Sequence, residues 1–427
     1  MKLTRYKLGE ILNVTRGASL SGEFYATEGE YIRLTCGNFD YQNNCFKENK
    51  SKDNLYYVGD FRSEFLMEEG DIITPLTEQA IGLLGSTAII PESGKYIQSQ
   101  DVAKIVCKED LLDKNFAFYL ISSALVKQQL SAAAQQTKIR HTSPDKIKDC
   151  TVWIPELSEQ KRIGKLLRSI DSKIELNRQI NQNLEAMAKQ LYDYWFVQFD
   201  FPNEEGKPYK SSGGKMVWNE KLKREIPEGW NISLIKDIAT TYSGGTPKST
   251  NIEYYDNGEI AWINSGELNS PIITKTTNYI TKCGLENSSA KLYPSNSILV
   301  AMYGATAGKV SLLTFEACSN QAVCGVIPTI ENMLYYVYFH ISSLYSHFIT
   351  LSTGSARDNI SQDTIKNILL PIPTRNILKL FDEKIGSIYQ TIVNNYQQID
   401  SLTKQRDELL PLLMNGQVSV NSDLSLG

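Results

Sequence analysis

The chain has 427 residues, of which 41% are hydrophobic and 22% are charged, the composition of an ordinary globular protein with room for two or three domains. No apolar stretch approaches the roughly 18 residues of a membrane span, no signal-peptide pattern opens the chain, and seven cysteines without a Cys-x-x-Cys pair stand beside three histidines, so we predict a soluble, cytoplasmic protein that binds no metal. The net charge of −4 argues against tight DNA binding by the chain alone, because duplex affinity depends on phosphate neutralisation.

The sequence contains an internal repeat, in which residues 1–195 run parallel to residues 230–416. Similarity on this scale means that one folding unit occurs twice. The matching segments are Gly29–Gly37 with Gly258–Gly266, Gly70–Ile73 with Asn296–Leu299, Tyr119–Ser123 with Phe339–Ser343, Ser143–Lys148 with Ser361–Lys366, and Ile154-Pro155 with Ile372-Pro373. The last two pairs keep the same internal spacing in both copies, which makes them the clearest part of the repeat.

Each copy begins with a globular part, residues 1–155 in the first and residues 226–373 in the second. Short β-branched and aromatic runs such as 72–74 and 298–300 alternate with turn signals, and residues 116–130 have the pattern of a helix. The sequence therefore predicts two tandem α+β domains.

Each copy ends in a long helix, predicted over residues 156–199 and residues 374–416. Apolar residues recur at heptad spacing through both helices. The apolar residues at heptad spacing form a seam along each helix, and a shift of 218 residues superposes the two seams, with Asn177 aligned to Asn395. Asn181 and Arg406 are further polar residues in seam positions. An Asn in a seam typically fixes register at some cost in stability. We therefore predict that Asn177, Asn181 and Asn395 set the register of this helix pair.

The two helices are predicted to pair with each other as an antiparallel coiled coil. Because each helix follows a globular domain in a head-to-tail repeat, this pairing would place one domain at each end of a pseudo-two-fold molecule. A helix over residues 158–195 spans roughly 55 Å, so the pair would separate the domains like a ruler. The alternative is that both are ordinary amphipathic core helices.

Two segments lie outside the repeated pattern. Residues 200–225 are rich in Pro, Gly and Ser, which is the composition of a linker. Residues 417–427 are predicted to be a C-terminal tail.

The sequence offers no catalytic residues. Residues 304–310 resemble a phosphate-binding loop, but the loop is one residue too short and ends in Val310 where Ser or Thr would hold magnesium. No dinucleotide fingerprint, amino-methyltransferase motif or His-Glu-x-x-His zinc motif is present. We therefore predict that this chain is not an enzyme and binds no cofactor.

Polar loops suited to nucleic acid remain. Residues 135–140 and 353–359 occupy the same place in the two copies, directly before the shared Ser-x-Asp helix. Arg and Lys suit guanine edges or phosphates, and Gln or Asn suits adenine. For any single residue the alternative is a solvated polar loop. The predicted DNA contacts are Arg33, Gln79, Gln136, Lys138, Arg140, Asn264, Tyr303, Thr306, Lys309, Ser355, Arg357 and Asn359.

Motifs in a fixed order cover nearly the whole chain. They are Ile154–Ile163 continuing through Ile170–Asn177, then Tyr194–Pro202, Ile226–Trp230, Ser243–Pro247 and Leu409–Gly416. Together they resemble the specificity subunits of type I restriction-modification enzymes, with a central conserved region, a second target-recognition domain and a distal conserved helix. One departure is that Thr374-Arg375-Asn376 replaces the Glu-Gln start of the first helix, although Thr374 is itself a good N-cap.

This resemblance implies that residues 1–155 and 226–373 are target-recognition domains. Each would read one half of a bipartite, asymmetric DNA target in the major groove, and the paired helices would set the spacer. The resemblance also implies two methyltransferase subunits, which methylate adenine with S-adenosylmethionine, and two restriction subunits, which use ATP and magnesium. The chemistry would then belong to the partners, which would also help to hold the duplex.

Two other classes of protein fit part of the sequence. One is a coiled-coil adaptor whose two end domains bind proteins or glycans rather than DNA. The other is an enzyme fused to recognition domains. A salt titration of DNA binding separates the first from a specificity subunit, and a methyl-transfer assay on the isolated chain separates the second.

Overall fold

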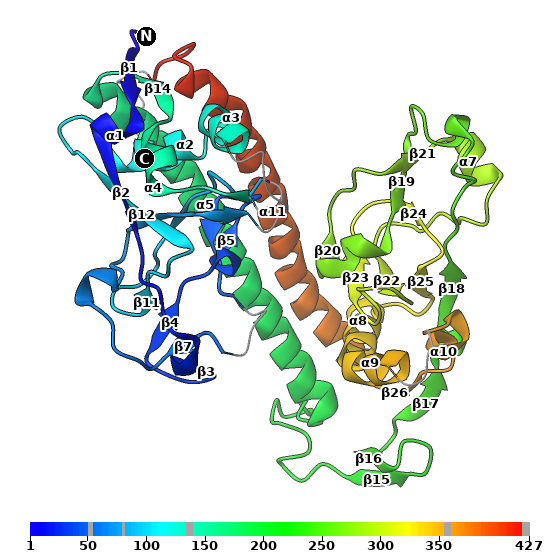
Figure 1. Ribbon diagram of the computed structural model, residues 1–427. Helices are drawn as coiled ribbons and strands as arrows, with labels where there is room; N and C mark the ends of the chain where they lie inside the picture. Colours follow the sequence, from blue (N-terminus) through cyan, green and yellow to red (C-terminus); the bar gives the residue numbers. More distant parts are fainter. Residues whose placement is uncertain (50–53, 79–81, 134–139, 354–359, 421–427) are drawn as a thin grey trace. The chain divides into compact units, whose positions relative to one another are not determined.

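The computed structural model describes residues 1–49, 54–78, 82–133, 140–353 and 360–420. The chain divides into two compact units (Figure 1): unit 1 contains residues 1–174 and 401–427, and unit 2 contains residues 175–400. Each unit holds one globular domain and a stretch of both long helices. The division falls within the helices, rather than at their ends, because each helix stretch packs into the core of its own unit.

The globular domain of unit 1 is built on a four-stranded antiparallel sheet in the order β10-β8-β12-β2. Its strands are β2 (Leu12–Arg16), β8 (Ile72–Pro75), β10 (Ala88–Ile89) and β12 (Val102–Cys107). The central strand β8 is buried along its whole length, which explains its continuous apolar run. Helix α2 (Lys114–Ile121) packs into the same core with six consecutive buried residues.

A strand pair closes this domain. β1 (Thr4–Lys7) runs antiparallel to β14 (Thr151–Ile154), so the first and last strands of the domain lie side by side. Helices α1 (Leu8–Ile11), α3 (Ala124–Ala133) and α4 (Pro144–Lys148) complete it. The helix expected over residues 116–130 is two helices, α2 and α3. Helix α2 ends at Ile121, and the hydroxyl of its C-cap Ser122 donates to the Phe118 carbonyl oxygen (3.1 Å).

The remaining strands of unit 1 form small sheets in the orders β11-β4-β7-β3, β5-β6 and β13-β9. They are β3 (Tyr25–Ala26), β4 (Tyr31–Arg33), β5 (Phe39–Asp40), β6 (Cys45–Phe46), β7 (Tyr56–Tyr57), β9 (Thr77–Glu78), β11 (Tyr96–Ile97) and β13 (Arg140–His141). These sheets enclose a second core around Leu34, Phe39 and Met67.

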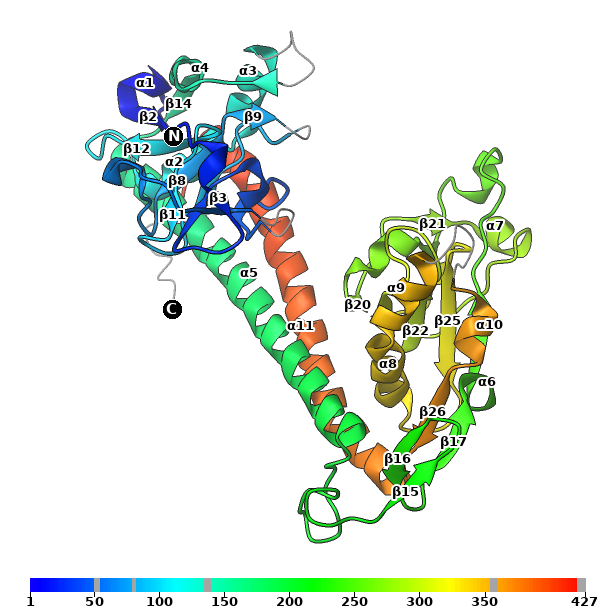
Figure 2. The same ribbon diagram turned by 60° about the horizontal axis from the view of Figure 1, so that its bottom comes forward.

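The globular domain of unit 2 has sheets in the orders β18-β25-β22-β23-β20, β21-β19-β24 and β17-β26. Its strands are β17 (Asn231–Leu234), β18 (Ala239–Ser243), β19 (Ile260–Ile263), β20 (Ile272–Ile273), β21 (Tyr279–Ile280), β22 (Ser297–Ala301), β23 (Val310–Leu313), β24 (Cys318–Ser319), β25 (Val323–Pro328) and β26 (Leu369–Ile372). Its helices are α6 (Ile235–Ile238), α7 (Lys282–Glu286), α8 (Leu334–Ser343), α9 (Tyr345–Thr353) and α10 (Gln362–Lys366). Figure 2 shows α8 and α9 on one side of β22 and β25.

The strand pairings of unit 2 repeat those of unit 1. β25 lies between β18 and β22, as β12 lies between β2 and β8. β17 pairs with β26, as β1 pairs with β14. β19 is parallel to β24, as β4 is parallel to β11. The predicted tandem α+β domains are therefore confirmed.

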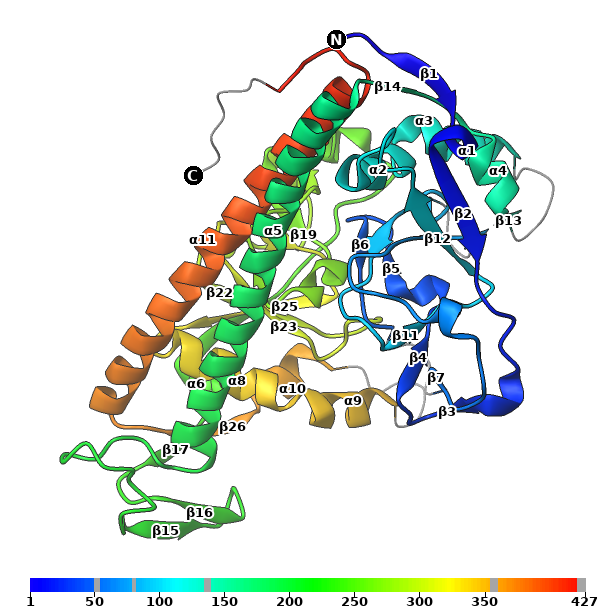
Figure 3. The ribbon, with the colours of Figure 1, turned by 90° about the vertical axis from the view of Figure 1, so that its left-hand side faces the viewer.

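Two long helices run side by side (Figure 3): α5 (Leu157–Tyr192), which continues into a π-helical turn at Asp193–Val197, and α11 (Arg375–Met414). Within unit 2, Asn181 contacts Asn395, and the Trp195 ring lies 5.7 Å from the Phe381 ring. Residues further along α5 thus contact residues earlier in α11, which confirms that the two helices are antiparallel. Neither helix, nor any other helix of the described residues, has the length and apolar character of a membrane span.

Residues 200–225, which their composition predicts to be a linker between the two copies, fold against unit 2. β15 (Met216–Asn219) pairs with β16 (Arg224–Pro227) in a hairpin. The Phe201 ring stacks on Tyr209 at 4.7 Å and on Trp230 at 5.3 Å. These aromatic contacts join the segment to the core of unit 2.

Candidate nucleic-acid interface

A tight loop between β22 and β23 carries three of the predicted DNA contacts, Tyr303, Thr306 and Lys309. The backbone N–H of Gly308 donates to the Ala301 carbonyl (2.8 Å), and that of Ala301 donates to the Lys309 carbonyl (2.9 Å), which closes the loop. Gly308 has a φ of +80°, a conformation that residues with side chains rarely adopt. The loop is thus a defined turn of backbone and not an extended surface segment.

This loop is fastened to the 3₁₀ helix Ser265–Asn269. The Thr306 hydroxyl donates to the Ser265 carbonyl (2.9 Å), and the Lys309 ammonium group donates to the Asn269 side chain. Asn264, which precedes the 3₁₀ helix, accepts a hydrogen bond from the Asn320 amide (3.1 Å). The structure therefore brings Asn264, Thr306 and Lys309 together, although Thr306 is only 4% exposed and uses its hydroxyl inside the fold.

Three polar residues beside this cluster escaped the sequence analysis: Asn320, Gln321 and Thr246. Gln321 and Thr246 are exposed and contact each other. The Gly244-Gly245 pair is the sequence feature that could have pointed to these residues. A Cβ at Gly244 would lie 2.1 Å from the Asn320 carbonyl oxygen, so only glycine allows the two backbone segments to approach this closely. In unit 1, a Cβ at Gly17 would likewise lie 2.2 Å from the Gln98 carbonyl oxygen, so the close backbone approach occurs in both copies.

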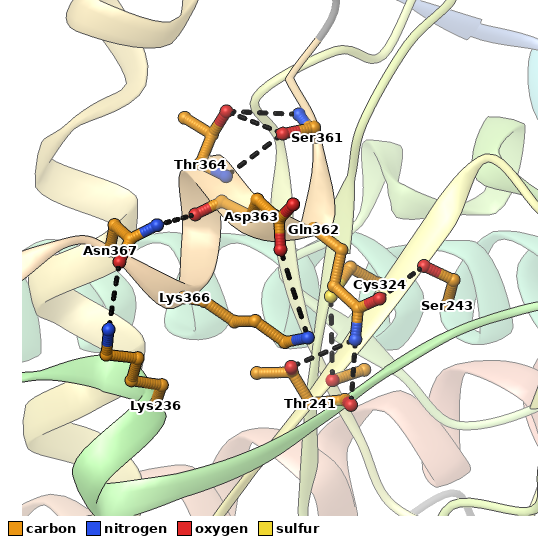
Figure 4. A network of polar contacts seen from close by, with 11 residues as sticks. Lys236, Thr241, Ser243, Cys324, Ser361, Gln362, Asp363, Thr364, Lys366 and Asn367 are labelled. Carbon is orange, nitrogen blue, oxygen red and sulfur yellow. Dashed lines mark hydrogen bonds and ion pairs between the residues drawn. The ribbon is translucent and has the colours of Figure 1, made fainter.

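Helix α10 is bound to the sheet by one glutamine, as Figure 4 shows. The Gln362 amide donates to the carbonyl (2.8 Å) and the hydroxyl (3.0 Å) of Thr241, and its oxygen accepts from the Ser243 hydroxyl (3.1 Å). Ser361 caps the helix through the Thr364 N–H (3.0 Å). Residues 355–359, with the predicted contacts Ser355, Arg357 and Asn359, lie outside the described residues.

The shared Ser-x-Asp-x-Ile-Lys motif has the same structural role in α4 of unit 1. Ser143 caps α4 through the Lys146 N–H (3.3 Å), and Asp145 lies 2.8 Å from the Lys148 ammonium group. Ile147 is buried, as Ile365 is in α10. Helix capping and anchoring therefore account for the shared motif.

Arg33 is a correction to the predicted DNA contacts. Its guanidinium group lies 3.9 Å from the centre of the Tyr25 ring and donates to the Asn54 carbonyl (3.3 Å). The residue is only 8% exposed. Arg33 therefore stabilises the small sheets of unit 1 and does not present its donors to a duplex.

The other predicted contacts of unit 1 flank the strand pair β9–β13. Arg140 is paired with Glu78 in this sheet, so the backbone segments that lead to Gln79 and to residues 136–138 meet there. Gln79, Gln136 and Lys138 lie outside the described residues, as does the side chain of Arg140.

The helix pair brings together two of the three predicted register residues. The Asn395 amide donates to the Asn181 side-chain oxygen (2.8 Å), and the Asn181 amide donates to the Ile392 carbonyl (3.3 Å). Asn181 is 2% exposed and Asn395 is 9% exposed. Asn177 is more exposed and donates to Gln398 instead (3.2 Å).

The polar residues around the loop between β22 and β23 suit recognition by hydrogen bonding. Its side chains are amides, hydroxyls and a lysine, which donate and accept hydrogen bonds. Burial raises the pKa of the nearby Cys324 thiol to about 12, so this thiol is protonated at neutral pH. Among the described residues, no group of three His, Cys, Asp or Glu side chains is arranged to hold a metal.

Known proteins share this architecture. The family model for the type I restriction modification DNA specificity domain matches residues 2–186 and again residues 227–409. The chain therefore belongs to the family of type I restriction-modification specificity subunits, with one copy of the domain in each half.

Individual relatives agree with this assignment. The chain is 25% identical over 326 residues to the MjaIX specificity subunit of Methanocaldococcus jannaschii, covering 75% of this chain and 73% of that protein. It is 26% identical over 379 residues to the HindI specificity subunit of Haemophilus influenzae, covering 76% of this chain and 81% of that protein. The crystal structure of an S subunit from M. genitalium has the same fold, with a TM-score of 0.62, 15% identity and coverage of 97% and 96% of the two chains.

Proposed function

We propose that this chain recognises a bipartite, asymmetric DNA target, with each globular domain reading one half-site. The observation that supports this most directly is the duplication of one domain, with paired strands in the same order and different polar groups around them. Gln362 of unit 2 corresponds to Pro144 of unit 1, and Thr241 corresponds to Val14. Two copies that differ in this way are suited to two different half-sites.

The proposed contacts of unit 2 are Asn264, Tyr303 and Lys309, with Gln321 and Thr246 added from the structure. Amides suit adenine edges, and lysine suits guanine or phosphate. Gln79, Gln136, Lys138, Arg140, Ser355, Arg357 and Asn359 remain proposed contacts from the sequence. The Asn181–Asn395 pair is proposed to fix the register of the helices, since a buried polar pair is satisfied in one register.

We further propose that two methyltransferase subunits bind the helix pair, and that two restriction subunits complete the enzyme. In unit 2, Leu176, Ile180 and Met187 of α5 are 55%, 37% and 56% exposed, and their spacing puts them on one helix face. An exposed apolar stripe on a helix is suited to a partner protein. S-adenosylmethionine, ATP and magnesium would bind the partners, and this chain would bind none of them.

The test begins with the methylome of a host that carries the chain and its methyltransferase, which would identify the target. Gel-shift competition would then use duplexes altered in one half-site at a time. We expect Lys309→Ala to weaken discrimination at one half-site and leave the other unchanged. Equal loss at both half-sites would indicate general electrostatics, and a complex with no preference among duplexes would refute the proposal.

The salt dependence of binding separates this function from that of an adaptor. Phosphate contacts make the affinity for DNA fall steeply as salt rises, whereas an adaptor has no such contacts. Methyl transfer by the isolated chain would instead show that the chain is itself an enzyme.

A further inference from the structure

One carboxylate in unit 1 joins the globular domain to both long helices. Asp171 of α5 accepts a hydrogen bond from the Tyr119 hydroxyl of α2 (2.5 Å) on one oxygen. Its other oxygen accepts from the Arg406 guanidinium group of α11 (3.0 Å). Three elements that are distant in sequence therefore meet at a single side chain.

This network is largely shielded from water. The Arg406 side chain is 11% exposed and that of Asp171 is 18% exposed. Burial raises the pKa of Tyr119, and the charge of Asp171 raises it further, so the phenol keeps the proton that it donates. Arg406 also lies 2.8 Å from Asp407, which is mostly exposed. Asp171 is thus the carboxylate that holds Arg406 on the inner side of the helix pair.

The second copy has no such network at the same place. The repeat aligns Tyr119 with Phe339, and the shift of 218 residues between the helices aligns Asp171 with Tyr389 and Arg406 with Ala188. Phe339 and Tyr389 pack edge to face, with ring centres 6.1 Å apart, and Ala188 is fully buried. Neutral side chains, among them Tyr192 with its hydroxyl 3.2 Å from the His340 ring, therefore suffice to hold this domain on the helices, and the charged network of unit 1 is not needed for packing alone.

The ion pair makes the junction of unit 1 more directional than the neutral junction of unit 2. Apolar surfaces tolerate a shift of register, whereas a buried guanidinium that loses its carboxylate is strongly disfavoured. A slip of one heptad along a helix moves about 10 Å, and successive base pairs are about 3.4 Å apart. A slip would therefore displace a domain by about three base pairs along the DNA.

We propose that Asp171 is a positioning residue for DNA recognition, which fixes the globular domain of unit 1 on the helix pair and thereby restricts the spacer that the protein accepts. This inference rests on the proposed function, because the spacer has meaning only for a bipartite target. The partners of Asp171 in this role are Tyr119 and Arg406.

The experiment measures methylation by the complex of the full chain with its methyltransferase subunits. The duplexes carry the target found in the methylome, with the spacer unchanged, three base pairs shorter or three base pairs longer. Asp171→Asn is expected to raise activity on the altered spacers relative to the native spacer by about tenfold, the change expected when a hydrogen bond to a charged group is weakened. Discrimination against base changes within each half-site should stay as in the wild type.

Two further variants keep the test decisive if Asp171→Asn folds poorly. Tyr119→Phe removes one hydroxyl and preserves the ring, so it should relax the spacer to a smaller extent. Asp171→Arg combined with Arg406→Asp restores an ion pair of reversed polarity and should recover spacer discrimination that either single change loses. Tyr389→Phe, at the aligned position of unit 2, removes the neutral hydrogen bond between the Tyr389 and Tyr338 hydroxyls and leaves no charge unpaired, so it is the matched control and should leave spacer discrimination unchanged.

The outcomes separate this inference from the proposed function. Folded variants with wild-type spacer discrimination would overturn the role of Asp171 and leave bipartite recognition intact. A wild-type complex that prefers no duplex would overturn the proposed function itself. Relaxed discrimination in Tyr389→Phe to the same extent as in Asp171→Asn would show a general loosening of the helices and would also overturn the inference.

Discussion

The two units use one arrangement of strands but hold their globular domains on the helices by different chemistry. In unit 1 the junction contains the network of Tyr119, Asp171 and Arg406. In unit 2 the junction is an aromatic cluster in which the Phe381 ring lies 4.7 Å from the Phe196 ring. The difference shows that the repeated fold requires a packed junction but not a charged one. A charged network at the junction can therefore serve to position the globular domain on the helices.

The largest expected effect comes from emptying the aromatic junction. Phe381 is fully buried, with Trp195 and Phe196 against it, so Phe381→Ala should lower the free energy of unfolding by about 3–5 kcal/mol. Ile163 is the aligned and equally buried residue of unit 1, and Ile163→Val should cost about 1 kcal/mol. Urea unfolding measures both. A cost below about 2 kcal/mol for Phe381→Ala would contradict the role of the aromatic cluster in stability.

Low pH should destabilise unit 2 through protonation of His340 in the unfolded chain. The aligned residue of unit 1 is Leu120. Burial lowers the pKa of His340 to about 4, and the uncharged ring donates to the Leu369 carbonyl (3.1 Å) and faces the Tyr192 hydroxyl (3.2 Å). Because the pKa in the folded chain lies below the ordinary value, only the unfolded chain takes up the proton between about pH 6.5 and pH 4. Stability should therefore fall as the pH falls through this range.

The measurement compares unfolding at pH 7.5 and pH 5 in the wild type and in His340→Leu, which copies unit 1. The loss between the two pH values should be smaller in the variant by about 2 kcal/mol. The variant also leaves the Leu369 carbonyl without its donor, so it is expected to be less stable at pH 7.5. An identical pH dependence in the two proteins would show that His340 is not the group responsible.

The smallest effect is expected at α10, where Gln362 replaces the Pro144 of unit 1. Gln362→Ala removes the hydrogen bonds to Thr241 and Ser243 and should cost about 1–2 kcal/mol in unfolding free energy. Gln362→Glu keeps the acceptor for Ser243 but cannot donate to Thr241, so it should be at least as destabilising as the alanine variant. A glutamate variant as stable as the wild type would show that the bonds to Thr241 contribute nothing.

The internal repeat and the helix pair could be predicted from the sequence because both depend on local patterns. Heptads identify the helices, and the Ser-x-Asp motif identifies the cap of α4 and α10. The role of Arg33 could not be predicted, since its stacking on Tyr25 depends on how β4 is placed in a sheet. Thr306 has the residue type of a DNA contact, but a backbone carbonyl 41 positions away in sequence takes its hydrogen bond.

The hairpin of β15 and β16 could not be predicted from the sequence for a related reason. Composition alone reports Gly, Pro and Ser, while the stacking of Phe201 on Tyr209 and Trp230 is a tertiary contact. The register of the helix pair was predicted in part. The seam positions were found, yet the buried contact joins Asn395 to Asn181, because antiparallel helices oppose residues that the alignment of the two copies does not superpose.

The closing strand pairs have a consequence for how such proteins change over generations. β1 lies beside β14, and β17 lies beside β26, so each domain ends close to the point where it begins. A segment whose ends are adjacent can be replaced by another of different length without disturbing its surroundings. Recombination at these strands would exchange a whole domain as one cassette, and a lineage could acquire a new target in a single event while the helices and their partners stayed as they were.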